Sequence, residues 1–165
     1  MKALLVLLAL TGTAAADGKL GWRIGGLRAP LGERDLTTFS LGLEIEHPLA
    51  CDLRIYGEYD FLWVTDRASD TMDFTGSGHR AGAGVRHRLL GATAARLIHF
   101  YVDGELGGGM VLASTPNGAV VVPHAIAGLR AGYTLHGWEP ELMVRALAAE
   151  HGAGAMLGFG MLWGD

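Results

Sequence analysis

The feature that most constrains this sequence is the strict alternation of side-chain character along two neighbouring runs, residues 38–47 and 53–64. Successive side chains of a β-strand point to opposite faces, so a period of two sustained over a whole run predicts a strand with two different environments. Both runs exceed the usual strand of about five or six residues and approach the length with which a tilted strand crosses a bilayer. The two runs therefore predict a long β-hairpin.

The same alternation recurs along the rest of the chain and predicts an all-β fold. The expected strands are residues 20–30, 38–47, 53–64, 78–89, 97–110, 120–135, 138–149 and 153–163. His136 and Gly137 form an expected two-residue turn, and residues 65–77 and 111–119 are expected loops. An even number of long, tightly connected strands closes naturally into an antiparallel up-and-down barrel. Two features fit less well: alanine-rich residues 138–149 could form a helix, and Pro123 and Pro140 lack a ladder donor.

The first residues have the pattern of a secretory signal peptide. Lys2 gives a positive start, residues 3–10 are apolar, and Ala14 and Ala16 occupy the positions that a signal peptidase reads. We expect residues 1–16 to be removed and residues 17–165 to form one domain. No later apolar run approaches the roughly 20 residues of a membrane helix, so the mature chain is either a soluble protein or a β-barrel.

Composition excludes several classes of function. Without Lys2 the chain has 12 basic and 17 acidic residues, which is no nucleic-acid footprint. Cys51 is the one cysteine, so an internal disulfide is impossible, and the seven histidines show no metal-ligand spacing. The glycines form no phosphate-binding loop. We therefore predict no cofactor and no metal.

Three observations predict that the charged face lies inside the barrel. First, many of the 26 glycines share the charged face, and small residues are needed where a narrow barrel is crowded. Second, that face carries eight acids against seven arginines, a balance that suits bidentate pairing in a confined space. Third, aromatic residues on the apolar face fall near strand ends, as in the two aromatic girdles of a membrane barrel. The predicted girdle residues are Trp22, Tyr133, Trp138 and Trp163 at one end, and Phe39, Phe61 and Trp63 at the other.

At this point the chain resembles the small eight-stranded outer-membrane barrels of Gram-negative bacteria, the OmpA-type and OmpX-type proteins. The resemblance covers residues 17–165 and rests on architecture, with a last strand that ends Phe159-Gly160-Met161-Leu162-Trp163 before Gly164 and Asp165. It implies a porin-like transmembrane barrel in the outer membrane, in contact with lipid and folded by the barrel-assembly machinery, which recognises a terminal aromatic residue.

The inward charges form the predicted site. The expected interior network consists of Glu44, Arg54, Glu58, Arg86, Asp103, Glu105, Arg130 and Arg145. If the turn at residues 47–52 pairs Ile45 with Leu53, Glu44 stands opposite Arg54. Similar counting places Glu58 diagonal to Arg86, places Asp103 and Glu105 beside Arg130, and places Arg145 next around the wall. The network is predicted to be a polar plug, since an eight-stranded barrel is just wide enough for side chains; a narrow pore is the alternative.

Catalysis has little support in the sequence. Outer-membrane deacylases use a His-x-Ser arrangement with a carboxylate, whereas here Ser77 and His79 occur in reversed order, with Asp73 nearby. We predict a structural or envelope-associated protein that is not an enzyme. Three alternatives remain open: a narrow passive pore, a soluble periplasmic lipocalin-like barrel that binds a ligand, and an adhesin that acts through the two expected loops.

Overall fold

A computed structural model describes residues 18–31, 34–66, 74–94, 98–115, 118–150 and 152–164. The predicted signal peptide lies outside these residues. The described residues form eight strands, which are β1 (Lys19–Leu31), β2 (Arg34–Ala50), β3 (Leu53–Asp66), β4 (Phe74–Ala94), β5 (Ile98–Thr115), β6 (Gly118–Thr134), β7 (Trp138–Ala149) and β8 (Gly152–Trp163). None of the described residues forms a helix that is long and apolar enough to cross a membrane.

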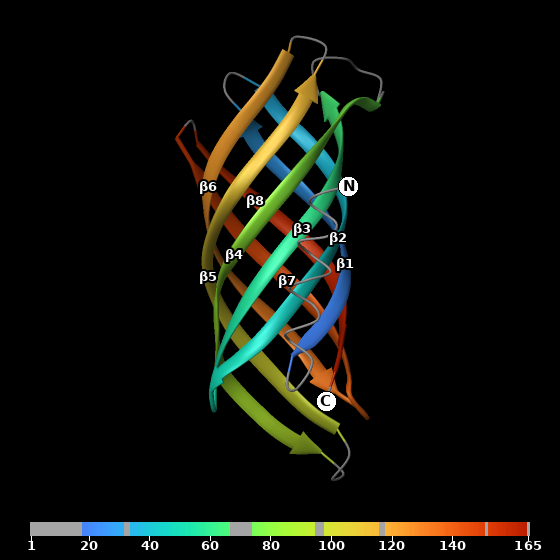
Figure 1. The fold of residues 1–165 in the computed structure, drawn as a ribbon, viewed down its shortest axis with the longest axis vertical. Coiled ribbons are helices and arrows are strands. Elements are labelled where there is room, and N and C mark those ends of the chain that lie inside the picture. The colour runs from blue at the N-terminus through green and yellow to red at the C-terminus, as the bar shows by residue number, and fades with distance from the viewer. Residues whose placement is uncertain are drawn as a thin grey trace.

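The strands form a closed antiparallel barrel in which each strand pairs with its sequence neighbours and β8 pairs with β1 (Figure 1). This confirms the predicted up-and-down topology. We call the end where β1 begins and β8 ends the terminal end, and the opposite end the distal end. At the terminal end, His136 and Gly137 have φ angles of 50° and 79° and close a two-residue hairpin between Leu135 and Trp138. Left-handed residues at both positions match the twist of the flanking strands.

The strands are longer than the sequence predicts at the distal end. The expected loop at residues 111–119 is wrong, because β5 continues to Thr115 and β6 begins at Gly118. The expected loop at residues 65–77 is shorter than predicted, because β3 includes Asp66 and β4 begins at Phe74. Residues 111–115, which were expected in a loop, are held in β5 by pairing with β4 and β6. The alternative of an adhesin that acts through residues 111–119 therefore loses the loop on which it depended.

Staggered strand ends explain the two prolines. The β6–β7 ladder runs from His124 to Gly132, so Pro123 of β6 lies just beyond one end of it. Pro140 of β7 pairs with Met161 of β8 and lies beyond the other end of the β6–β7 ladder. Tilted strands of a barrel leave such short free edges at its rims, and edges are where proline is tolerated.

The two faces of the wall have opposite character. Side chains that point into the barrel are buried and include five arginines, whereas large apolar side chains point outward and are exposed. Leu106 is 63% exposed and Leu157 is 66% exposed, while Arg86 and Asp103 are 0% exposed. The apolar face of this barrel is therefore its outer wall, and the charged face lines its lumen.

Candidate functional site

Charge pairs line the lumen. In the part of the chain that the structure describes, eight acids and eight bases take part in the ion pairs that line it. The acids are Glu44, Glu46, Glu58, Asp60, Asp103, Glu105, Glu139 and Glu141, and the bases are Lys19, Arg23, Arg54, Arg80, Arg86, Arg88, Arg130 and Arg145. We call this set the lumen network. Its signs balance, so no charge of the set lacks a counter-charge.

Glu44 is the most connected acid of the lumen network. Its two carboxylate oxygens accept hydrogen bonds from Nη1 of Arg23 at 3.0 Å, from Nη2 of Arg86 at 2.6 Å and from Nη2 of Arg130 at 2.7 Å. These bases come from β1, β4 and β6, so the contacts reach across the lumen as well as along the wall. A buried carboxylate is stable when its lone pairs are satisfied by charged donors. Glu44 therefore ties three parts of the wall together.

Glu58 and Glu105 share Arg145 of β7. Nη1 of Arg145 donates to Glu58 at 2.7 Å, while its Nε and Nη2 both bind Glu105, the latter at 2.9 Å. Glu105 also accepts a hydrogen bond of 2.8 Å from Nε of Arg130. Planar guanidinium groups suit such forked contacts, which explains why the interior bases are almost all arginine.

Asp60 forms the distal end of the lumen network. It pairs with both Nε and Nη2 of Arg23, at 2.8 and 2.7 Å, and with Nε of Arg80 at 2.7 Å. Arg80 also lies 3.2 Å from Glu58. Arg23, Asp60 and Arg80 are among the acids and arginines of the charged face but lie outside the eight residues of the predicted network.

Tyr56 lies at the centre of the arginines. Its ring centroid is 5.1 Å from the guanidinium carbon of Arg86, 5.8 Å from that of Arg130 and 5.7 Å from that of Arg145. An aromatic face attracts cations at these distances. Glycines make the room that this ring needs, because a Cβ at Gly84 or Gly107 would lie 2.7 Å from the Tyr56 hydroxyl.

The terminal end of the lumen is closed by a second group of pairs. Arg54 binds Glu46 at 2.6 Å and Asp103 at 2.9 Å, and Nε of Arg88 donates to Asp103 at 2.8 Å. Lys19 is absent from the predicted network, yet its Nζ donates to Glu139 at 2.6 Å. Lys19 is the first residue of β1. It lies an even number of residues from Arg23, and this spacing could have placed it on the charged face.

Two of the predicted pairings are wrong. Glu44 lies opposite Glu58, and Arg54 lies opposite Pro48, because Ile45 pairs with Gly57 instead of Leu53. Glu58 lies opposite Gly82, and its partners are Arg23, Arg80 and Arg145 in place of Arg86. The strands extend closer to the turn than predicted, with a bulge at Pro48 and Ala50, and this shifts the register. The other placements agree: Asp103 lies opposite Arg130, and Arg145 lies opposite Gly128 of the same strand as Arg130.

The distal part of the lumen contains two apolar clusters together with the buried polar side chains Thr38, Ser40 and His124. Beyond Asp60, the inward side chains of β3 are Leu62 and Val64, which pack with Val111 and Ala113 of β5. A second buried cluster joins Leu27, Met143, Leu147 and Met156 on the opposite wall. These clusters cover the lumen network at its distal end.

The predicted aromatic residues lie on the outer wall in two groups. Near the terminal end, ring centroids are 6.1 Å apart for Trp138 and Trp163, 5.9 Å for Phe100 and Tyr133, and 5.8 Å for Trp22 and Phe159. Near the distal end, the centroids of Phe39 and Trp63 are 5.5 Å apart, and those of Phe61 and Trp63 are 4.7 Å apart. The distal group lies on β2 and β3, so the aromatic residues of the described strands form two patches instead of two full rings.

His79 of the Ser77 and His79 constellation lies on the outer wall and contacts aromatic side chains. Nδ1 of His79 lies 2.6 Å from the Tyr59 hydroxyl, and its ring packs beside Tyr59 and Phe61 on the outer wall. Asp73 lies outside the described residues. Among the described residues, no group of three or more His, Cys, Asp or Glu side chains has the arrangement of a metal site.

Comparison with known proteins identifies the fold. No model of a known family matches the sequence, and no curated protein matches it either. The structure of Neisserial surface protein A matches with a TM-score of 0.58 at 11% sequence identity, over 88% of this chain and 96% of that protein. The chain has the fold of the small eight-stranded outer-membrane barrels. The outer-membrane protein Ail of Yersinia pestis, in a phospholipid bilayer nanodisc, gives a TM-score of 0.46 at 14% identity, over 89% of this chain and 100% of that protein.

The resemblance predicted from the sequence is therefore confirmed for the fold. With this fold assigned, the lumen network occupies the interior of a small outer-membrane-type barrel. Chemically, the described part of this interior offers paired charges that link neighbouring and opposite strands of the wall.

Proposed function

We propose that this chain is an integral outer-membrane protein whose lumen is sealed and whose role in the envelope is structural, without catalysis. The observation that carries the proposal is the sign-balanced lumen network beneath the two buried apolar clusters near the distal end. A solute that crossed this lumen would have to separate buried ion pairs and then pass Leu62 and Val64. Breaking a buried pair costs about 3–5 kcal/mol, so the closed state is strongly favoured.

The outer wall supports the membrane location. Along β5, exposed apolar side chains extend from Phe100 to Leu112. At about 3.3 Å per residue and a strand tilt of about 40°, this band spans roughly 30 Å, close to the apolar height of outer-membrane barrels. A soluble lipocalin-like barrel would place its apolar face inward, which is the reverse of what these side chains do. Lipid is therefore the expected partner of the wall.

Biogenesis follows from this location. Export through a cleaved signal peptide at residues 1–16 and insertion by the barrel-assembly machinery are part of the proposal. Trp163 ends the last strand and supplies the terminal aromatic residue, with Gly164 and Asp165 after it. Removing these two residues is expected to leave insertion unchanged, whereas Trp163→Ala is expected to lower the inserted fraction.

The proposal is tested by fractionation and by conductance. The full-length protein is expected in the membrane fraction after a urea wash, and it is expected to migrate faster on a denaturing gel before boiling than after. Purified protein in a planar bilayer is expected to give no discrete conductance steps. Recovery in the soluble periplasm would refute the membrane location. Conductance steps that change with Arg130→Glu would refute the sealed lumen and support a pore.

A further inference from the structure

β4 and β5 continue past the other strands at the terminal end. Their ladder runs on to Ala94, and Figure 1 shows the paired ends of these two strands reaching beyond the rest of the wall. On its other side, β4 pairs with β3 only as far as His87, opposite Leu53. β5 keeps its second partner, because the β5–β6 ladder continues to His99. Residues 89–94 of β4 therefore form an edge that has no ladder partner among the described residues. We call it the β4 edge.

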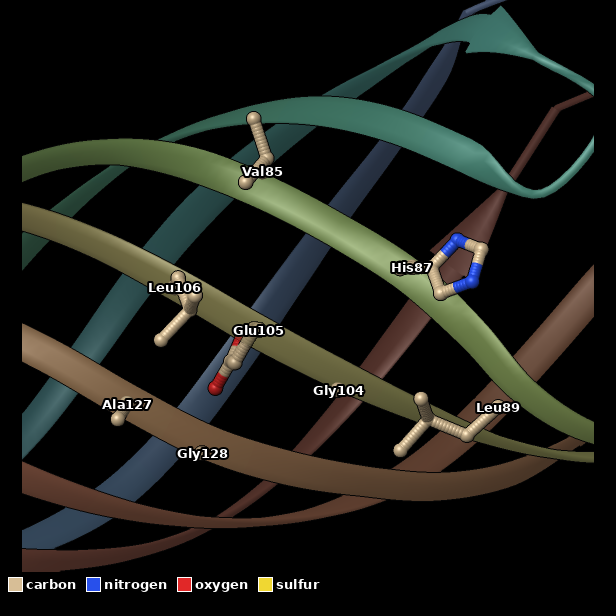
Figure 2. Close-up of a pocket in the computed structure, with 8 residues that line it drawn as sticks. All are labelled: Val85, His87, Leu89, Gly104, Glu105, Leu106, Ala127 and Gly128. Atoms are coloured by element: carbon tan, nitrogen blue, oxygen red, sulfur yellow. The ribbon is translucent and has the colours of Figure 1, made fainter.

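A bulge marks the place where the β4 edge begins. β3 starts directly after its turn, and the backbone N–H of Arg88 donates to the carbonyl oxygen of Asp52 in that turn at 2.9 Å. The bulge lies between Arg88 and Leu90, and a bulge bends its strand. Figure 2 shows Leu89 beside Gly104 of β5, where an added Cβ would lie 3.2 Å from the Leu89 side chain. Past this point no described residue of β3 remains to pair with β4.

The β4 edge extends to the aqueous side of the terminal-end aromatic residues. Ala92 pairs with Phe100, whose ring centroid lies 5.9 Å from that of Tyr133 in the aromatic group near the terminal end. Residues 93 and 94 follow Ala92 and lie farther from the barrel centre along β4. Unpaired backbone groups are not tolerated in the hydrocarbon of a bilayer. The free backbone groups of the edge must therefore meet water or a partner outside the hydrocarbon.

The chemistry of the edge selects an extended polypeptide. Every second residue of a strand directs its N–H and C=O to the same side, so the edge presents donors and acceptors at the spacing of a ladder. An acyl chain offers neither. The outer face of the hairpin adds apolar contacts, since Leu89 is 52%, Leu90 is 67% and Phe100 is 49% exposed. A partner strand with apolar side chains on its outer face matches both features.

The β4 edge of a second barrel in the same membrane cannot supply this strand. Two copies with a closed interface are related by a two-fold axis along the membrane normal, because both cross the membrane in the same direction. Barrel strands tilt by about 40° from that axis, so the β4 edges of two copies would cross at about 80°. Paired strands run nearly along one line. The occupant is therefore a different chain that is free to align with β4.

We propose that the β4 edge binds an extended segment of a second protein, in the aqueous compartment on the terminal side, which joins the sheet as a strand antiparallel to β4. The proposal rests on the membrane location proposed above, which exposes the edge to that compartment. Antiparallel pairing is the more stable arrangement per residue. The bound segment places apolar side chains beside Leu90 and Ala92, and its C-terminal end lies near Cys51 in the turn before β3.

Cys51 supplies a reporter, because it is exposed, it precedes Asp52 and it is the one cysteine of the chain. The probe is a synthetic peptide with the sequence of residues 98–102, which pairs with β4 on its other side, followed by a cysteine that carries a 2-thiopyridyl disulfide. The Cys51 thiolate attacks the cysteine sulfur of the peptide, a mixed disulfide forms and 2-thiopyridone leaves, and its absorbance is measured. An antiparallel strand brings a C-terminal cysteine to Cys51 and carries an N-terminal cysteine to the far end of the edge. We expect roughly tenfold faster exchange with the C-terminal cysteine, because docking raises the local concentration of the reacting group.

Two N-methylated peptides test whether backbone hydrogen bonds hold the probe. Methylation of the third and fifth residues removes donors from one side of the strand, and methylation of the second and fourth removes them from the other. We expect one of these peptides to lose the rate advantage and the other to keep it, because only one side of the probe faces β4. A probe held by its side chains would respond equally to both.

Cys51→Ser combined with Gly18→Cys is the matched control. Gly18 precedes β1, which pairs with both β2 and β8 within its first two residues. All peptides should react with this variant at one common rate. Equal rates for the two cysteine positions at Cys51, or equal losses with the two methylated peptides, would overturn the proposal. The full-length mature protein is assayed in vesicles after a urea wash. Protein lost in that wash refutes the membrane location, and the ratio of exchange rates still decides the edge site.

Discussion

The substitution Glu44→Gln tests whether the lumen network holds the barrel together. Glu44 accepts hydrogen bonds from Arg23, Arg86 and Arg130 at 2.6 to 3.0 Å and is 2% exposed. Glutamine keeps the shape but removes the charge, which leaves the lumen with one base in excess. Removing one partner of a buried pair typically costs about 3–5 kcal/mol, and we expect the free energy of unfolding to fall by that amount.

Glu139→Gln is the matched control. Glu139 also pairs inside the barrel, but its base is Lys19, whose side chain is 22% exposed. Water can solvate the lysine after the substitution, so the expected cost is about 1 kcal/mol or less. The free energy of unfolding of both variants is measured by urea unfolding in phospholipid vesicles. The fraction of compact protein on an unboiled gel reports the folded fraction. A Glu44→Gln variant no less stable than Glu139→Gln would refute the reasoning.

A second substitution separates charge balance from lost contacts. Arg86→Met added to Glu44→Gln restores the balance, and Glu46 keeps its pair with Arg54. We expect the double variant to be less destabilised than the sum of the two single variants, because residues in one network are coupled. Strict additivity would show that the pairs act independently and that the balance of signs is irrelevant.

Two further predictions concern the wall and the lumen space. Leu157→Arg places a charge on the outer wall and should destabilise a lipid-facing barrel by about 2–4 kcal/mol. Leu49→Arg, beside the terminal-end turn, should cost about 0–1 kcal/mol. Urea unfolding in vesicles measures both variants, and equal, negligible effects would show that the wall faces water. Gly42→Val should prevent folding, because a Cβ there would overlap the carboxylate of Asp60, while Gly57→Ala meets Ile45 at an ordinary 3.5 Å and should fold. The compact gel band measures both, and a stable Gly42→Val barrel would contradict the packing described for the lumen.

The faces of the strands were predictable because the period of two is local information. The predicted register placed Ile45 opposite Leu53, whereas Ile45 pairs with Gly57. An error of this kind changes which residues meet, but a shift by an even number of residues leaves every side chain on its face. The inside and outside of the wall therefore survived an error in the hairpin. Turn geometry fixes register, and the bulge at Pro48 and Ala50 left no clear mark in the sequence.

The distal loops were mispredicted for a different reason. Residues 111–115 continue β5, and residues 74–77 begin β4. Residues 111–113 are apolar, and only Ser114 and Thr115 are typical of turns, yet pairing with a neighbouring strand holds all five in β5, as Ser77 opposite Ser114 illustrates. Strand propensity depends strongly on such context. Only the closed sheet reveals how far each strand continues.

The ion-pair partners in the lumen were the hardest part to predict. Many of these pairs join opposite walls of the barrel, whereas sequence counting predicts only neighbours on adjacent strands. Arg130 of β6 reaches Glu44 of β2, and Arg145 of β7 reaches Glu58 of β3, both across the barrel. In a narrow barrel, opposite walls are within reach of a long side chain, so an interior charge chooses among partners from every strand. Cross-strand neighbours supply only part of this choice. A balance of signs over the whole inward face, which the sequence does display, is therefore better evidence for a sealed lumen than any single predicted pair.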